Sequence, residues 1–213
     1  MKSFSNKGNA SIVMDIIDAI KSNKNYLSDI DGLIGDGDHG INMNKGFSIA
    51  GQRISDDETF SSAMKILGDT LLLEIGGSMG PIYGTFFRTC ALKTKDLEEI
   101  VAPEFCAMLE SANEKVKGIG GAKVGDKTLI DTLEPAVCAM KSAVADGLDF
   151  KEALSVASEA AENGKESTKG MVAKIGRASR LGERSRGVLD AGATSCCIIL
   201  KSMMESVSEK LGN

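Results

Sequence analysis

The feature of this sequence that most limits its fold is a repeated alternation of amphipathic helical segments with short glycine-rich loops. In residues 11–22, for example, Ile12, Ile16 and Ile20 recur at helical spacing and leave the charged residues on other faces. Alternation with a period of two, which is typical of strands, is scarce. The pattern predicts an all-α fold of about eight helices in antiparallel up-and-down order.

In such an order, loops separated by about two helices fall on the same rim. The four glycine-rich loops, which lie within residues 31–47, 76–87, 118–128 and 176–195, should therefore meet at one end. The first predicted helix runs out near Asn25, and the glycine- and aspartate-rich stretch after it should be a loop that leads to a helix at about residues 41–52. Asp96 with Glu99 resembles a capping box for a later helix that contains Pro103 early and reaches about Lys117.

Composition limits the class of protein. The 213 residues include three prolines and no low-complexity run, which favours one domain over residues 1–213. The net charge is −5, and the basic residues form no stripe that could neutralise a nucleic-acid backbone. No apolar stretch approaches the ~18 residues of a membrane span. We therefore expect a cytoplasmic protein that binds neither nucleic acid nor membrane.

The cysteine spacing and the histidine count exclude a structural zinc site. The five cysteines lie mostly in apolar helical patterns, which predicts reduced, buried thiols. With one histidine and no CxxC pair, a structural zinc site has too few of its preferred ligands.

Residues 31–47, DGLIGDGDHGINMNKGF, combine Asp31, Asp36 and Asp38 with a run of glycines and the only histidine, His39. Glycine weakens helices and strands, and clustered aspartates repel one another unless a positive charge lies between them. A polar surface turn has a similar composition. A cation site explains the clustered charges better.

Three common motifs come close in this sequence and fail. The GxGxxG spacing at Gly35, Gly37 and Gly40 has aspartates around it and no apolar strand before it. An EF-hand loop started at Asp36 would have Phe47 where glutamate is required. The P-loop-like stretch at residues 120–128 again follows no strand.

Three aspartates suit Mg²⁺, which takes hard oxygen ligands and commonly binds phosphate oxygens as well. Nucleotide phosphates bridged by Mg²⁺ would explain how an acidic loop accepts a polyanion, with Ser78 and the amides of Gly76 and Gly77 donating hydrogen bonds. Arg177 is the candidate for the charge on a transferring phosphoryl group, although any single arginine is more often a solvated surface residue. His39 is better suited to orienting a ligand than to carrying a phosphoryl group.

Four segments together resemble a known family. GDGDHGINMNKGF, GGSMGPIYGTFF, GDKTLIDTLEP and GRASRLGERSRGVLDAGATS, in this order and spacing, resemble the nucleotide-binding L subunit of bacterial dihydroxyacetone kinases. The resemblance implies an eight-helix antiparallel barrel that binds ADP or ATP with two Mg²⁺ ions at its rim. It implies that Asp31, Asp36 and Asp38 bind the metal.

The resemblance also implies the nucleotide contacts, and the chain departs from the family at two of them. The family commonly has alanine then serine where this chain has Ser78 then Met79, and proline where this chain has Ala191. The nucleotide contacts are expected at His39, Gly40, Ile41, Asn42, Ser78, Met79, Gly120, Leu129, Arg177, Asp190, Ala191 and Gly192.

The resemblance implies that this chain is one part of an enzyme. A phosphoryl group would pass from the nucleotide to dihydroxyacetone, or a similar small hydroxyketone, held on a K-type subunit. The phosphate donor is either ATP or a phosphotransferase-system carrier (M subunit) that recharges bound ADP. The oligomeric state is undecided, and a homodimer is one possible state. The alternative is a non-catalytic, nucleotide-loaded module that docks on another protein, such as a transcription regulator.

Overall fold

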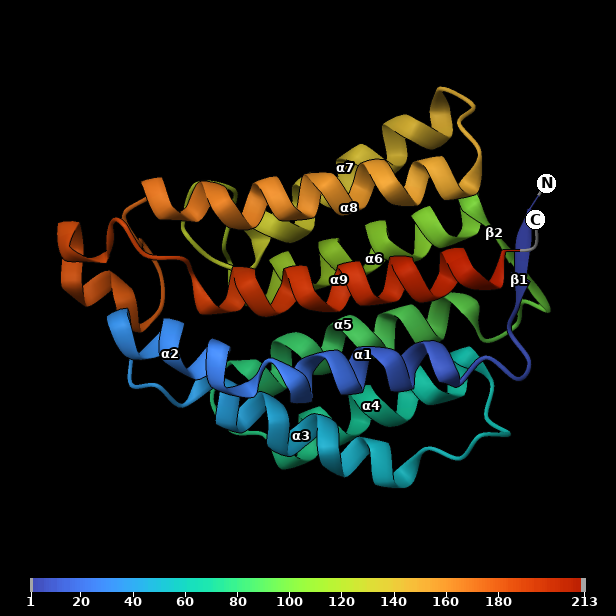
Figure 1. Cartoon of the computed structure of the whole chain (residues 1–213), viewed down its shortest axis with the longest axis horizontal. Helices are drawn as coiled ribbons and strands as arrows, with labels where there is room; N and C mark the ends of the chain where they lie inside the picture. The colour runs from blue at the N-terminus through green and yellow to red at the C-terminus, as the bar shows by residue number, and fades with distance from the viewer. Residues whose placement is uncertain (1, 212–213) are drawn as a thin grey trace.

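The computed structural model describes residues 2–211, and these form the all-α fold that the sequence predicts, with one small two-stranded sheet (Figure 1). The helices are α1 (Ser11–Ser22), α2 (Lys24–Ile34), α3 (His39–Arg53), α4 (Phe60–Glu74), α5 (Met79–Thr94), α6 (Ala102–Gly120), α7 (Ile130–Ala145), α8 (Phe150–Ser167) and α9 (Ala191–Lys210). Two 3-10 segments, η1 (Thr168–Gly170) and η2 (Arg177–Ser185), connect α8 to α9.

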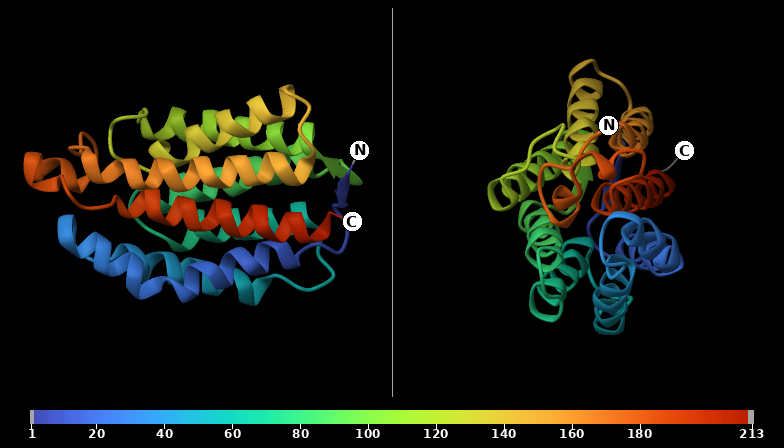
Figure 2. Two further views of the ribbon diagram at one scale, coloured as in Figure 1. Left: turned by 45° about the horizontal axis from the view of Figure 1, so that its top comes forward. Right: turned by 90° about the vertical axis from the view of Figure 1, so that its left-hand side faces the viewer.

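The helices run up and down around a closed ring. Neighbours in the chain pack against each other, and α9 packs on α1 to close the ring (Figure 2). The helices α1 and α2 run in the same direction and form one arm that bends at Asn23, whose side-chain amide donates to the carbonyl of Ala19 (2.8 Å). The nine described helices therefore make eight arms.

The prediction of a loop between the first helix and residue 40 was wrong, because α2 occupies residues 24–34. Its apolar residues Leu27, Ile30 and Ile34 have helical spacing and are buried. The aspartates and glycines among them obscured that spacing in the sequence. Asp31 therefore lies on the last turn of a helix instead of in a loop.

The prediction of a capping box at Asp96 and Glu99 was also wrong. Residues Glu99–Val101 form strand β2, which pairs antiparallel with β1 (Ser3–Ser5). The helix α6 begins after it, and Glu104 in its first turn accepts a hydrogen bond from the backbone of Val101 (3.0 Å). The pairing depends on a segment about a hundred residues away, which local sequence does not reveal.

The two strands close the end of the bundle that is opposite to the glycine-rich loops (Figure 1). Phe4 of β1 packs edge-on against Phe60, with ring centroids 5.4 Å apart, and lies near Phe105 and Phe150. Such aromatic contacts add to the free energy gained by burial. The loop end is left free to carry polar groups.

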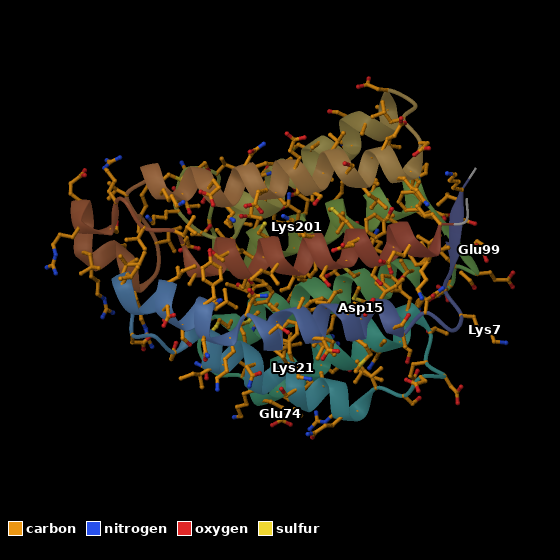
Figure 3. All side chains as sticks on the ribbon, in the orientation of Figure 1. Lys7, Asp15, Lys21, Glu74, Glu99 and Lys201 are labelled. Carbon is orange, nitrogen blue, oxygen red and sulfur yellow. The ribbon has the colours of Figure 1, made fainter. Side chains whose placement is uncertain are left out.

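Charged side chains of both signs are spread over the outside of the bundle, with Lys7 and Glu99 at the strand end and Lys201 on α9 (Figure 3). The five cysteines are unpaired within the described residues; four are buried, as predicted, but Cys138 is exposed. No helix in residues 2–211 is long and apolar enough to cross a membrane.

Asn6 ties the strand end together and gives a test of the fold. Its side-chain amide donates to the carbonyls of Thr94 (2.9 Å) and Leu97 (2.8 Å), and its side-chain oxygen accepts from the amide of Ser61 (3.0 Å). We expect Asn6→Ala to lower the free energy of unfolding in urea by about 2 to 4 kcal/mol, because buried backbone groups lose their partners.

Asn9→Ala is the matched control for this experiment. The amide of Asn9 makes one hydrogen bond, to the carbonyl of Ser5 (2.6 Å), so the loss should stay below about 1 kcal/mol. Equal losses in the two variants would contradict the assignment of Asn6 as the link between these segments.

Candidate functional site

A cleft of about 840 Å³ opens at the loop end of the bundle. Residues from all four predicted glycine-rich loops line it, together with the ends of the helices that flank them. The alternation of helix directions therefore does bring the four loops to one rim, as the sequence analysis predicts.

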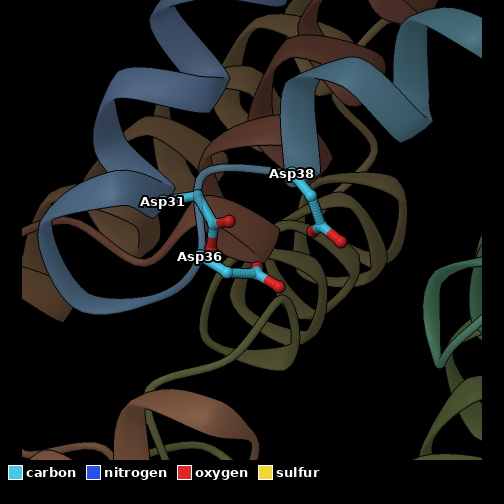
Figure 4. A group of neighbouring side chains, drawn as sticks. All are labelled: Asp31, Asp36 and Asp38. Carbon is cyan, nitrogen blue, oxygen red and sulfur yellow. The ribbon is translucent and has the colours of Figure 1, made fainter.

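Three carboxylates meet at one side of this cleft (Figure 4). Asp31 lies on the last turn of α2, Asp36 lies in the short link, and Asp38 is the N-cap residue of α3. One oxygen from each lies within 4.8 Å of the others. The link can turn this tightly because position 35 is glycine: a Cβ there would collide with the side chain of Asp31.

These donors fit a magnesium ion. Mg²⁺ binds oxygens at about 2.0–2.1 Å, so its ligands lie at most roughly 4.2 Å apart, and small side-chain movements would close the cluster around it. The guanidinium of Arg177, from η2, pairs with the carboxylate of Asp36. The structure thus places the predicted catalytic arginine directly beside the predicted metal ligands.

The N-termini of α3, α5, α7 and α9 all face this end of the bundle, because alternate arms start there. The first amides of a helix lack partners within the helix and attract anions. Asp190 caps α9 by accepting from the amide of Ala193 (2.7 Å), whereas Ser78 makes no side-chain cap on α5. The α5 terminus therefore offers donors to a bound anion.

His39 joins three helices behind the cleft wall. Its Nε2 lies 2.8 Å from the hydroxyl of Ser195 on α9, which is 2.6 Å from the hydroxyl of Tyr83 on α5. Burial lowers the pKa of His39 to about 4, although the nearby Asp31 acts in the opposite direction. The imidazole is thus neutral at pH 7 and bonded into the wall, which fits a positioning role.

The loop before α7 is held by two buried side chains that the sequence analysis did not single out. The carboxylate of Asp131 accepts from the amides of Gly125 (2.5 Å) and Thr128 (2.7 Å). The ammonium of Lys127 donates to carbonyls of the segment between α8 and α9. Both side chains lie in or next to the stretch 120–128, whose P-loop-like spacing fails as a motif.

Asp190 lies at the floor of the cleft, where α9 begins. Burial raises the pKa of its carboxyl to about 6, and the hydrogen bond from Ala193 and the charge of Lys127 oppose that rise. A carboxyl in this state is only partly ionised near pH 6, so it adds less than a full negative charge to the cleft there.

Most of the residues predicted to form the site line the cleft. They are Asp31, Asp36, Asp38, His39, Asn42, Ser78, Met79, Gly120, Leu129, Arg177, Asp190, Ala191 and Gly192. Gly40 and Ile41 are not among the lining residues. Gly40 is buried where α3 crosses α2, so that a Cβ would meet the carbonyl of Lys24, and the side chain of Ile41 points to solvent.

An apolar part of the cleft was missed by the sequence analysis. Val116 and Ile119 at the end of α6, Ala122 and Leu129 in the next loop, and Ile175 before η2 line it together. Ile119 is 51% and Ile175 37% exposed, and in the sequence each stands next to a glycine, which is the only signal that the sequence offers. A surface of this kind suits a flat, apolar ring.

Comparison with known proteins places the chain in a family. Residues 33–205 match the family described as the DAK2 domain. The chain is 37% identical over 194 residues to the ADP-binding subunit DhaL of the PEP-dependent dihydroxyacetone kinase of Escherichia coli (strain K12), covering 90% of this chain and 92% of that one. It is 34% identical to a DhaL subunit of Listeria innocua, covering 93% of each.

Longer relatives contain the same unit as part of one chain. The chain is 33% identical to the L-erythrulose kinase of Pectobacterium atrosepticum but covers only 32% of that protein. The crystal structure of the dihydroxyacetone kinase of C. freundii superposes with a TM-score of 0.71 at 24% identity, over 92% of this chain and 34% of that one. The same kinase is known in complex with AMP-PNP and Mg²⁺.

The fold and the cleft define an all-α protein with a carboxylate cluster at the loop end of a helical ring. The chain belongs to the DAK2-domain family, and it covers 92–93% of relatives that are named ADP-binding subunits.

The single histidine allows a direct test of the buried site. In the metal-free protein, the imidazole C–H resonances should titrate by NMR with a midpoint near pH 4, and in urea near the ordinary value of about 6.5. Because the folded protein binds this proton less tightly, the stability that His39 contributes is full above pH 6.5 and falls as the pH falls toward 4. A folded-state midpoint between pH 6 and 7 would exclude a buried His39.

Proposed function

We propose that this chain binds ADP or ATP with Mg²⁺ in the cleft and passes a phosphoryl group to dihydroxyacetone, or a similar small hydroxyketone, held on a separate K-type subunit. The observation that carries the proposal is the meeting of three carboxylates and an arginine in a cleft that the N-terminus of α5, which has no side-chain cap, also lines. Family membership and the names of the relatives support the same reaction.

Asp31, Asp36 and Asp38 would hold the magnesium, and we propose two ions, as the family resemblance implies. The metal supplies charge that offsets both the aspartates and the phosphates. The donor set is entirely oxygen, which suits Mg²⁺ and not a softer metal. His39 keeps α3 in place, and so fixes the direction in which Asp38 points, through its bond to Ser195.

The phosphates would lie between the aspartates and the N-terminus of α5. Ser78, Met79 and the preceding glycines present backbone amides there, and Asn42 lines the same part of the cleft. The base would occupy the apolar part formed by residues such as Ile119, Leu129 and Ile175. Gly120, Asp190, Ala191 and Gly192 line the remaining wall.

Arg177 is the group that we propose acts on the transferring phosphoryl. It is exposed and paired with Asp36, so it can reach the charge that develops on the phosphoryl oxygens. Phosphoryl transfer needs positioning and charge stabilisation more than covalent chemistry from the protein. An arginine at this place supplies both.

The names of the relatives that this chain covers to 92–93% support a proposal for the partner and the donor. These relatives are named subunits of PEP-dependent kinases, which supports a separate K-type subunit and a phosphotransferase-system carrier that recharges the bound nucleotide. We propose that the protein works in the cytoplasm, where such carriers act. We make no choice between a monomer and a homodimer.

The aspartates can be tested by isothermal titration. ADP or ATP should bind only when Mg²⁺ is present, and the double variant Asp36→Ala, Asp38→Ala should weaken binding by about 10²-fold or more, because the phosphates then lose their counter-charge. Asp29→Ala, which removes an exposed carboxylate from α2, is the control and should bind as the wild type does. Unchanged binding in the double variant would exclude this metal site.

Arg177 can be tested in the reconstituted reaction. With a K-type subunit, dihydroxyacetone and either ATP or a phosphotransferase-system donor, Arg177→Ala should lower transfer by about 10³-fold and keep the nucleotide Kd within about threefold. Arg180→Ala removes an exposed neighbour on η2 and should keep wild-type turnover.

Two outcomes of that assay would change the assignment. Wild-type turnover in Arg177→Ala would remove Arg177 from catalysis. No transfer by the wild-type protein with either donor would favour the alternative, a nucleotide-loaded module that docks on another protein such as a transcription regulator.

A further inference from the structure

Lys127 is a buried lysine in the loop that leads to α7. Its side chain is 1% exposed, and it is the one non-glycine residue with positive φ in the described part of the chain (φ 62°). Both features cost free energy, since a buried ammonium loses its hydration and a side chain with positive φ is strained. A buried, strained side chain of this kind stays in place only where the contacts around it hold it there.

The ammonium of Lys127 donates to three backbone carbonyls, those of Met171 (3.3 Å), Ser185 (2.6 Å) and Val188 (2.6 Å). An ammonium has three N–H groups, so these acceptors use all of its donors. Although Lys127 lines the cleft, it has no proton left for a phosphate oxygen. Its role therefore differs from that of a P-loop lysine.

The three carbonyls belong to one segment, residues 171–188, which we name the arginine loop. Further bonds join its two ends: the hydroxyl of Ser185 donates to the carbonyl of Gly182 (2.7 Å) and accepts from the amide of Ala173 (2.9 Å). Lys127 thus contacts the loop at its start and at its end. Arg177 lies between these anchors and reaches Asp36.

We propose that Lys127 is a positioning residue that anchors both ends of the arginine loop and so holds Arg177 beside the carboxylate cluster. Its effect on catalysis rests on the function proposed above for Arg177, but its effect on the loop does not. The lysine couples the loop before α7, which lines the nucleotide cleft, to the loop that carries the catalytic arginine.

The first test measures the loop itself. Four of the six arginines of the chain, Arg177, Arg180, Arg184 and Arg186, lie in this loop, so an arginine-specific protease reports its opening. Lys127→Met keeps the length of the side chain and removes the ammonium, and cleavage in the loop should become at least about tenfold faster while circular dichroism shows an intact bundle.

Lys174→Met is the matched control. The ammonium of Lys174 is in the same loop, but it is 60% exposed and pairs with Asp126 at 3.4 Å. Because the Lys174 side chain is mostly in water and Asp126 keeps its hydrogen bond from the amide of Lys123 (3.0 Å), cleavage should stay within about twofold of the wild type. Neither substitution changes the number of arginine sites.

The second test measures coupling to Arg177 in the reconstituted reaction. Lys127→Met should lower transfer at saturating nucleotide by about 10²-fold, as a small misplacement of a catalytic group does, and leave the nucleotide Kd within about threefold. In the Arg177→Ala background, adding Lys127→Met should lower transfer by less than about a further threefold. Both substitutions remove the same effect, the action of Arg177 on the phosphoryl group.

Three results would overturn the proposal. Wild-type cleavage of Lys127→Met would show that the lysine does not anchor the loop. A weaker nucleotide Kd with unchanged cleavage would show a direct phosphate contact, and additive losses with Arg177→Ala would show that the two residues act independently.

A second variant covers the case in which Lys127→Met does not fold. Ser185→Ala removes only the hydroxyl that joins Gly182 to Ala173, and it should also speed cleavage and lose its effect on transfer in the Arg177→Ala background. Wild-type behaviour of this variant would equally overturn the proposal. If the wild-type protein shows no transfer at all, the proposed function fails while the protease result still decides the role of Lys127.

Discussion

The burial of one apolar stripe per helix against its neighbours, in a ring that closes where α9 meets α1, determines the rest of this structure. In a closed ring of alternating arms, every second connection must lie at the same end. The four glycine-rich loops therefore meet although up to about 150 residues separate them. The strands and the phenylalanine cluster fill the opposite end, while the loop end has only a small buried apolar cluster of Ile30, Leu189 and Ala191.

The loop end can then carry charges that would not be stable in a core. Asp31, Asp36 and Asp38 repel one another, and Arg177 offsets part of that repulsion in the protein itself. A bound cation would offset more of the repulsion, so this cluster is also where a metal ion would bind most favourably. The hydrophobic contacts of the bundle, which lie away from this cluster, supply the stability that offsets the repulsion between the like charges.

The polar groups behind the cleft make its wall rigid. His39, Ser195 and Tyr83 connect α3, α9 and α5 through hydroxyl and imidazole contacts, while Asp131 and Lys127 hold loops that have little regular structure. Each of these groups is buried, and each has hydrogen-bond partners among the described residues, which is what keeps a buried polar group from being costly. A site for phosphoryl transfer needs this kind of fixed geometry, because its catalysis rests on positioning.

Sequence alone determined the fold class, the order of the arms and the composition of the carboxylate cluster, because helical periodicity and aspartate clustering are local properties. It did not determine that residues 24–34 are helical, that Glu99–Val101 pairs with Ser3–Ser5, or that Gly40 and Ile41 lie away from the cleft. The aspartates and glycines obscured the helical spacing of residues 24–34, and the other features depend on contacts between segments that are apart in the chain. The apolar wall near Ile119 and Ile175, the bond from His39 to Ser195 and the three carbonyls around Lys127 likewise came only from the tertiary structure, which alone decides which groups face one another.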